Sequence, residues 1–179
     1  MSCPSDFEEA RMHKGGGKHF AGKSMALGGT GQESHKSLGD FKRILVGFDG
    51  SDHSTRAVHI ACEFARKFLS KLIMINVYAP LVYGVPVSSV ESFESDLEHE
   101  ARNLVERAIS IAKGEGVEAT GETLMAQTAF QAITDYALAN HVDLIILGTR
   151  GLTGLKKLTM GSVSSGVVAH AHCPVLVVR

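Results

Sequence analysis

The feature that most constrains the fold is a set of five short segments with apolar side chains at nearly every position. A strand with one face in water alternates apolar and polar residues, whereas a strand covered on both faces does not. These runs therefore predict a parallel sheet with helices on both sides. The third run is weaker and contains Gly121, which suits an edge position. The predicted strands are Arg43–Phe48, Leu72–Val77, Val117–Leu124, Val142–Leu147 and Pro174–Val178.

Helical periodicity fills the gaps between these strands. Apolar residues recur at spacings of three and four, with Ser51 or Ser54 available as the cap of the first helix. Glu98 and Arg102 are placed to pair on the wet side of the second helix. Alternating strands and helices predict an α/β fold, a doubly wound parallel sheet with right-handed crossovers. The predicted helices span Ala57–Phe68, Phe93–Ala112, Ala129 to about Asn140, and Ser162–Ala171.

The composition of the chain changes near residue 41. Residues 1–40 contain no Val or Ile and eight of the 19 glycines. Such a segment cannot bury enough apolar surface to offset the entropy of ordering it. We therefore predict a flexible tail over residues 1–40 and one folded domain over residues 41–179.

Charge and cysteine usage exclude several classes of partner. The formal net charge is −1, so no basic field favours nucleic acid. No apolar run approaches the roughly 20 residues that cross a bilayer, and the first ten residues lack the apolar core of a secretory signal. Cys3, Cys62 and Cys173 are odd in number and far apart. Together these features predict a cytoplasmic protein with no disulfide framework, no nucleic-acid partner and no membrane partner.

A phosphate-binding pattern in the tail is interpreted as a chance match. Gly17–Ser24 fits the spacing GxxxxGKS. That pattern holds phosphate only between a buried strand and a helix, where the loop amides are rigidly fixed. The residues on either side are polar and rich in glycine, with no helical periodicity.

A second glycine motif has the context that the first one lacks. Gly148 follows the fourth predicted strand, Gly151 comes three residues later, and Gly161 and Ser162 open the last helix. Glycine permits close approach of a ligand, and a helix N-terminus attracts phosphate. Arg150 and two lysines add positive charge. The motif favours a phosphate site; the alternative is a pair of left-handed turns at Gly148 and Gly151 with Ser162 as an ordinary N-cap.

Two further features receive structural interpretations. Tyr78–Val90 is predicted as a long connection, which serves either as a lid over a ligand or as a plain surface loop or partner patch.

His170, His172 and Cys173 suggest a metal, but positions i and i+2 of a helix point apart and zinc requires four well-aimed ligands. No metal site is predicted.

The motifs taken together resemble the universal stress protein family. Asp49–Ser54 matches its DGSxxS start, Gly148–Ser162 matches GxxGxxxxxxxxxGS, and His170–Val178 matches an HxxCPVLVV-like end. The resemblance covers residues 41–179. It implies a five-stranded sheet of order 3-2-1-4-5 with the Rossmann-like, adenine nucleotide alpha hydrolase-like fold. It also implies a homodimer, often joined through the last strands, and a subclass that binds ATP through this glycine motif.

The resemblance further implies which residues hold the nucleotide. Ligands of open α/β sheets lie at the carboxyl ends of strands where the strand order reverses, here between the first and fourth strands. Asp49 would lie at the nucleotide; because its charge would repel a triphosphate, it is expected to bond ribose or base, or to act through a bound Mg²⁺. Val77 would contact adenine through its backbone. Ribose and phosphates would be held by Gly148, Arg150, Gly151, Gly161, Ser162, Val163 and Ser164.

The expected function is that of an ATP-binding regulatory protein with little or no turnover. Efficient phosphoryl transfer needs a positioned base and fixed metal ligands, yet Gly148–Ser165 contains no Asp or Glu. Two alternatives remain at this point: a slow ATPase on the same scaffold, and a nucleotide-free module for protein interaction.

Overall fold

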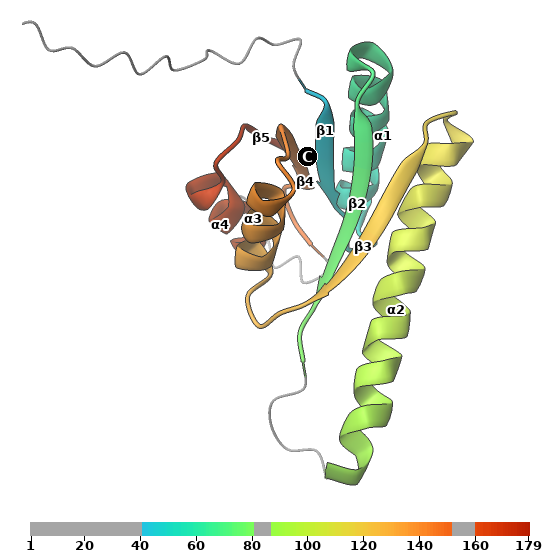
Figure 1. The fold of residues 1–179 in the computed structure, drawn as a ribbon, viewed down its shortest axis with the longest axis vertical. Coiled ribbons are helices and arrows are strands. Elements are labelled where there is room, and N and C mark those ends of the chain that lie inside the picture. The colour runs from blue at the N-terminus through green and yellow to red at the C-terminus, as the bar shows by residue number, and fades with distance from the viewer. Residues whose placement is uncertain (1–40, 81–86, 152–159) are drawn as a thin grey trace, which may run out of the picture. The chain divides into compact units, whose positions relative to one another are not determined.

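The computed structural model describes residues 41–80, 87–151 and 160–179. Strands and helices alternate along the chain, and the strands form one sheet between helices (Figure 1). This confirms the α/β class. The elements are β1 (Arg43–Gly47), α1 (Asp52–Phe68), β2 (Lys71–Tyr78), α2 (Val87–Gly114), β3 (Ala119–Met125), α3 (Ala129–Ala139), β4 (Leu144–Gly148), α4 (Ser162–His170) and β5 (Val175–Val178).

The sheet has the order β3-β2-β1-β4-β5, and every pairing between neighbouring strands is parallel. The order 3-2-1-4-5 is therefore confirmed, and β3 takes the edge position expected for the strand that contains Gly121. The chain leaves β1 toward β2 on one side and later returns to pair β4 on the other. Gly47, at the end of β1, lies opposite Ile75 of β2 and Leu147 of β4. The reversal of strand order is thus at the carboxyl end of β1.

Two hydrophobic cores cover the two faces of the sheet. One includes Val46 and Ala61 and involves α1 and α2; the other includes Leu45 and Val167 and involves α3 and α4. Adjacent residues of β1 face opposite cores, and each is fully buried. This explains why the strand is apolar at consecutive positions. Cys62, on α1, is also fully buried in the first core, as a small apolar side chain would be.

A tight turn brings the start of α1 to the carboxyl end of β1. Gly50 has a φ of +83°, a conformation that side-chain-bearing residues rarely adopt. Ser51 then caps α1, because its Oγ accepts the backbone N–H of Ser54 at 3.2 Å. Ser51 is therefore the cap that the sequence left open between two serines.

The predicted connection over Tyr78–Val90 is wrong at both ends. β2 includes Tyr78, which pairs with Met125 of β3, and α2 already begins at Val87. Ser and β-branched residues at the start of α2 are weak helix formers, so propensity gave no sign of this first turn. Residues 81–86, on which the lid hypothesis depends, lie outside the described residues.

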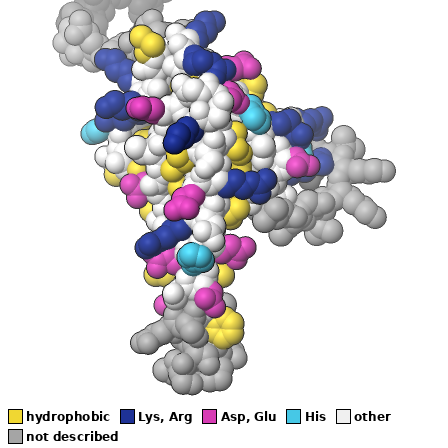
Figure 2. All heavy atoms as spheres, turned by 90° about the vertical axis from the view of Figure 1, so that its right-hand side faces the viewer, with side chains coloured by type: hydrophobic (Ala, Val, Ile, Leu, Met, Phe, Trp, Pro, Cys, Tyr) yellow, Lys and Arg dark blue, Asp and Glu magenta, His cyan; other side chains and the backbone are white. Residues whose placement is uncertain are grey.

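Helix α2 has 28 residues and continues past the end of the sheet (Figure 1). Its apolar face is buried at Ala101, whereas Phe93, in the second turn of the helix, is 48% exposed. Glu98 and Arg102 form the predicted i,i+4 ion pair. Figure 2 shows basic and acidic side chains interspersed on this side of the molecule, which fits the near-zero net charge. Of the helices in the described ranges, none has both the length and the apolar character needed to cross a membrane.

Candidate functional site

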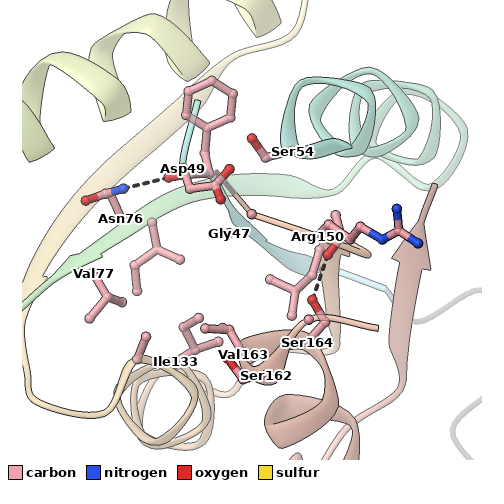
Figure 3. A pocket seen from close by; sticks show the side chains of 17 residues that line it. Gly47, Asp49, Ser54, Asn76, Val77, Ile133, Arg150, Ser162, Val163 and Ser164 are labelled. Carbon is pink, nitrogen blue, oxygen red and sulfur yellow. Dashed lines mark hydrogen bonds between the residues drawn. The ribbon is translucent and has the colours of Figure 1, made fainter. Parts of the chain in front are cut away.

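A cavity of about 310 Å³ lies at the carboxyl ends of β1 and β4, beside the start of α4 (Figure 3). Its size falls at the lower end of the range for small-molecule sites, about 300–1,000 Å³. The structure brings every site residue predicted from the sequence to this one cavity. These residues are Asp49, Val77, Gly148, Arg150, Gly151, Gly161, Ser162, Val163 and Ser164.

The carboxylate of Asp49 is held on the strand side of the cavity. Its Oδ1 accepts the backbone N–H of Ser51 at 3.0 Å, and Gly151 leaves room for its other oxygen. Ser51 also donates its hydroxyl to the carbonyl of Arg150 at 3.3 Å. The cap of α1 therefore connects the turn after β1 to the turn after β4, and both turns face the cavity.

The turn after β4 is fixed against the first turn of α4. Ser164 donates its hydroxyl to the carbonyl of Gly148 at 2.7 Å, and the N–H of Gly161 donates to the carbonyl of Thr149 at 2.7 Å. Ser164 is buried, so its hydroxyl works as a structural donor in this arrangement. The two glycine-containing segments of the motif thus form one hydrogen-bonded unit.

The purely conformational alternative for the glycines is wrong. Neither Gly148 nor Gly151 has a positive φ, and the N-cap of α4 is Gly161 rather than Ser162. Gly148 instead lets the backbone of α1 lie close to the end of β4, because a Cβ at this position would be only 2.7 Å from the backbone carbonyl carbon of His53. Helix α1 could not otherwise pack so closely against the end of β4.

The N-terminus of α4 gives the cavity a wall that suits an anion. Gly161 supplies no side-chain cap, and no acidic residue lies in the first turn. The N–H groups of Ser162, Val163 and Ser164 have no partners within the helix, because the first turn has no preceding carbonyls to bond. They stand at the positive end of the helix dipole, which favours an anion. Arg150 lines the same cavity and adds a positive charge.

The opposite wall of the cavity is apolar, with one buried amide. Asn76 is 7% exposed, and its Nδ2 donates to the carbonyl of Phe48 at 2.7 Å. In Figure 3, Asn76 and Val77 lie across the cavity from Ser162 and Val163. Sequence analysis missed Asn76, although a polar residue inside an otherwise apolar strand was a usable signal. The other lining residues that it did not assign are Gly47, Phe48, Ser54, Ile75, Ala129, Ile133 and Leu147.

A second cavity, of about 400 Å³, lies at the amino ends of β1, β4 and β5. His141, Arg43 and His172 are among its lining residues, and Arg43 Nε donates to the carbonyl of His141 at 3.2 Å. The C-terminal ends of α3 and α4 reach this edge, and the negative end of a helix dipole favours basic neighbours. Lys42 and Arg43 supply positive charge at this cavity, and the helix ends account for that charge without a ligand. In the described ranges, no three His, Cys, Asp or Glu side chains are grouped so that they could hold a metal ion.

Comparison with known proteins identifies the family. A model of the universal stress protein family matches residues 40–179. The chain belongs to the universal stress protein family. A curated relative from Thermus aquaticus, a universal stress protein in a QAH/OAS sulfhydrylase 3′ region, is 38% identical over 144 residues, which cover 78% of this chain and 99% of the relative. The match to the family model begins at residue 40, next to the boundary predicted at residue 41. The GxxxxGKS pattern at Gly17–Ser24 lies outside the residues that the structure describes.

Solved universal stress proteins share the fold. UspA from Lactobacillus plantarum superposes with a TM-score of 0.69 at 25% identity, covering 78% of this chain and 98% of that one. Another universal stress protein, solved in complex with cAMP, gives a TM-score of 0.60 at 26% identity and covers 77% of this chain and 97% of that one. The fold expected from the resemblance is confirmed.

Proposed function

We propose that this universal stress protein binds an adenine nucleotide, ATP, between β1 and β4, and that it acts as a nucleotide-dependent regulatory protein with little or no turnover. One observation carries the proposal: an uncapped helix N-terminus and an apolar wall face each other across a single cavity. A phosphate suits the first and an aromatic base suits the second. The relative in complex with cAMP supports the same class of ligand.

The chemistry of the two walls suggests how the nucleotide is oriented. Its phosphates would meet the amides of α4 and the guanidinium of Arg150, and its base would lie toward Val77 and Ile133. Asp49 would then face the ribose hydroxyls, where a carboxylate is a good acceptor. Asp49 is the one acidic residue among the described lining residues. A Mg²⁺ ion would therefore be held mainly by the nucleotide's own phosphates, as this ion commonly is.

A charge-placement experiment tests the proposal. Ser162 is exposed at the first position of α4, so Ser162→Asp and Ser162→Asn should both fold. The aspartate stabilises a helix start, yet it repels a phosphate placed there. We expect Ser162→Asp to retain or raise the melting temperature while it weakens ATP binding roughly tenfold or more in calorimetry. Ser162→Asn, which has the same size without the charge, should bind ATP within about threefold of the wild type.

Comparing ATP with adenosine separates recognition of the phosphates from recognition of the base. Adenosine carries no phosphate, so its affinity should be the same in Ser162→Asp and Ser162→Asn. If ATP binds both variants equally, the phosphates do not lie at α4 and the proposed site is wrong.

Turnover is measured separately. Without an acidic cluster at the cavity, no described group is placed to orient water and also fix a metal. We expect phosphate release no faster than about one per minute, against roughly 1–10³ per second for typical enzymes. Faster release that is lost in Ser162→Asp would favour the ATPase alternative.

We also propose a homodimer through β5. This strand pairs only with β4 within the described sheet, and its four residues are half-buried. A bare apolar edge invites pairing with another chain, and a two-fold partner would cover it. Sedimentation equilibrium should give twice the monomer mass, whereas a monomer at micromolar concentration would exclude this arrangement.

A further inference from the structure

Thr149 connects the turn after β4 to three other elements. Its N–H donates to the carbonyl of Val178 in β5 at 2.7 Å, and its carbonyl accepts the N–H of Gly161 at 2.7 Å. Its hydroxyl Oγ1 lies 3.0 Å from Nδ1 of His53 on α1. The backbone and the side chain of a single residue thus join β5, α1 and the start of α4.

These bonds determine where the amides of α4 stand. Gly161 is the N-cap, so its position sets that of the three N–H groups that follow it. Its own N–H is held by Thr149, and Thr149 is held in turn by His53 and Val178. Neither His53 nor Val178 is among the described residues that line the cavity. A binding group must be held within about 0.5 Å of its productive position by such supporting contacts.

We propose that Thr149 is the positioning residue of the phosphate-binding wall, and that His53 and Val178 act on the ligand through it. This inference rests on the proposed function, because it concerns how the same site is held in its binding geometry. It gives the backbone carbonyl of Val178, and not its side chain, a supporting role, although none of the described residues of β5 lines the cavity.

The contact between Thr149 and His53 depends on the hydroxyl group. A hydroxyl both donates and accepts, so it pairs with Nδ1 in either tautomer of the imidazole. Thr149→Val has the same shape and lacks the hydroxyl, whereas Thr149→Ser keeps it. Comparing the two variants separates the effect of the hydrogen bond from the effect of side-chain volume.

The first test compares ATP affinity in these variants. Losing one hydrogen bond should weaken ATP binding about threefold to tenfold in Thr149→Val, and Thr149→Ser should restore wild-type affinity. His53→Phe should cause a similar loss. If the two residues act through each other, the double variant should be no weaker than the weaker single variant. Equal affinities for the Val and Ser variants, or fully additive losses, would overturn the role of His53.

The second test shortens the last strand. Deleting Arg179 leaves the carboxylate of Val178 as an acceptor for Thr149, so ATP affinity should be retained. Deleting Val178 and Arg179 removes the acceptor and should weaken ATP binding by a similar threefold to tenfold. Val178→Ala keeps the backbone carbonyl and loses only packing, so it should bind like the wild type. If the alanine variant and the double deletion bind ATP equally, β5 does not act through Thr149.

A ligand-free readout separates this inference from the proposed function. Hydrogen exchange of the Gly161 amide reports directly on its bond to Thr149. In the apo protein we expect faster Gly161 exchange in Thr149→Val and in the double deletion, and wild-type exchange in Thr149→Ser and Val178→Ala. If wild-type protein binds no adenylate, the proposed function fails, and the exchange pattern still decides whether Thr149 positions α4. Unchanged Gly161 exchange in all variants would refute the positioning role.

Discussion

Asp49 and Gly151 are packed so closely that a Cβ on residue 151 would lie 2.5 Å from Oδ2 of Asp49. The other carboxylate oxygen of Asp49 accepts the N–H of Ser51, so the side chain cannot turn away without losing that bond. The second glycine of the motif therefore leaves room for the carboxylate that lines the cavity.

A methyl group at Gly151 should disturb nucleotide binding through Asp49. We expect Gly151→Ala to weaken ATP binding about tenfold, since overpacking costs about 1–3 kcal/mol. Titration calorimetry of the single variants and of the double variant with Asp49→Ala measures the coupling. In the Asp49→Ala background the added methyl should have no further effect. The same loss in both backgrounds would mean that Gly151 acts independently of Asp49.

Two helical glycines should respond in opposite ways to alanine. A Cβ on Gly166 would meet the ring of Phe130 at the contact between α3 and α4, with Cδ1 at 2.7 Å, whereas a Cβ on Gly114 would have no neighbour within 4 Å. Gly166→Ala should lower the free energy of unfolding by about 1–3 kcal/mol through overpacking. Gly114→Ala should raise it by up to about 1 kcal/mol through helix propensity.

Urea denaturation of both glycine variants gives this comparison directly. Gly166 lies in the middle of α4 and Gly114 is the last residue of α2, so helix propensity favours alanine at both positions and only the surroundings of Gly166 oppose it. Equal stabilisation of the two would show that α3 and α4 do not pack at Gly166.

Acid should weaken the contact between α1 and the end of α2. Glu115 contacts His59, and its Oε2 accepts from Arg66 at 3.2 Å. Partial burial raises the pKa of Glu115, but the hydrogen bonds and charges of His59 and Arg66 outweigh it and lower that pKa below its ordinary value of 4.5. A lowered carboxyl pKa contributes stability above the unfolded-state pKa, and this contribution is lost as pH falls through the folded-state pKa.

The contribution of Glu115 is measured from the free energy of unfolding as a function of pH. In the wild type this free energy should decline as the pH falls below about 4.5, and Glu115→Gln should remove part of that decline. The variant and the wild type should converge at low pH, where the carboxyl is protonated in both states. Parallel curves at all pH values would contradict the lowered pKa.

The thiol of Cys62 should be inert in the folded protein. Burial, together with the negative charge of Glu115, raises its pKa to about 11, and its side chain is fully buried. The thiolate is the reactive form, so iodoacetamide at neutral pH should leave Cys62 unmodified until the protein unfolds. Mass spectrometry of the Cys62 peptide with and without urea measures this. Equal labelling rates would show that α1 opens readily.

The sequence predicted the strands and the cavity because both depend on local pattern. Doubly buried strands are apolar at consecutive positions, and the motif residues follow strand ends that must meet at one edge of a parallel sheet. The family resemblance supplied the strand order. The start of α2 was not predictable, because Val87 and its neighbours are weak helix formers.

The apolar wall of the cavity could not be predicted for a different reason. Ala129 and Ile133 are ordinary core-forming residues of α3, and only the packing of α3 against the sheet brings them to the cavity. The roles of Thr149 and Gly148 depend likewise on contacts with His53, almost a hundred positions away in the sequence.

The most direct test of nucleotide binding at this cavity is a titration of ¹⁵N-labelled protein with ATP, followed by the backbone amide resonances. Backbone amides at the start of α4 should shift progressively and saturate, because we propose that they donate to phosphate. The amide of Val77, across the cavity, should shift with them, and adenosine should move Val77 while leaving Ser162, Val163 and Ser164 nearly unchanged. If saturating ATP leaves the amide resonances of α4 unmoved, or shifts only those of residues far from this cavity, the nucleotide does not bind at this site.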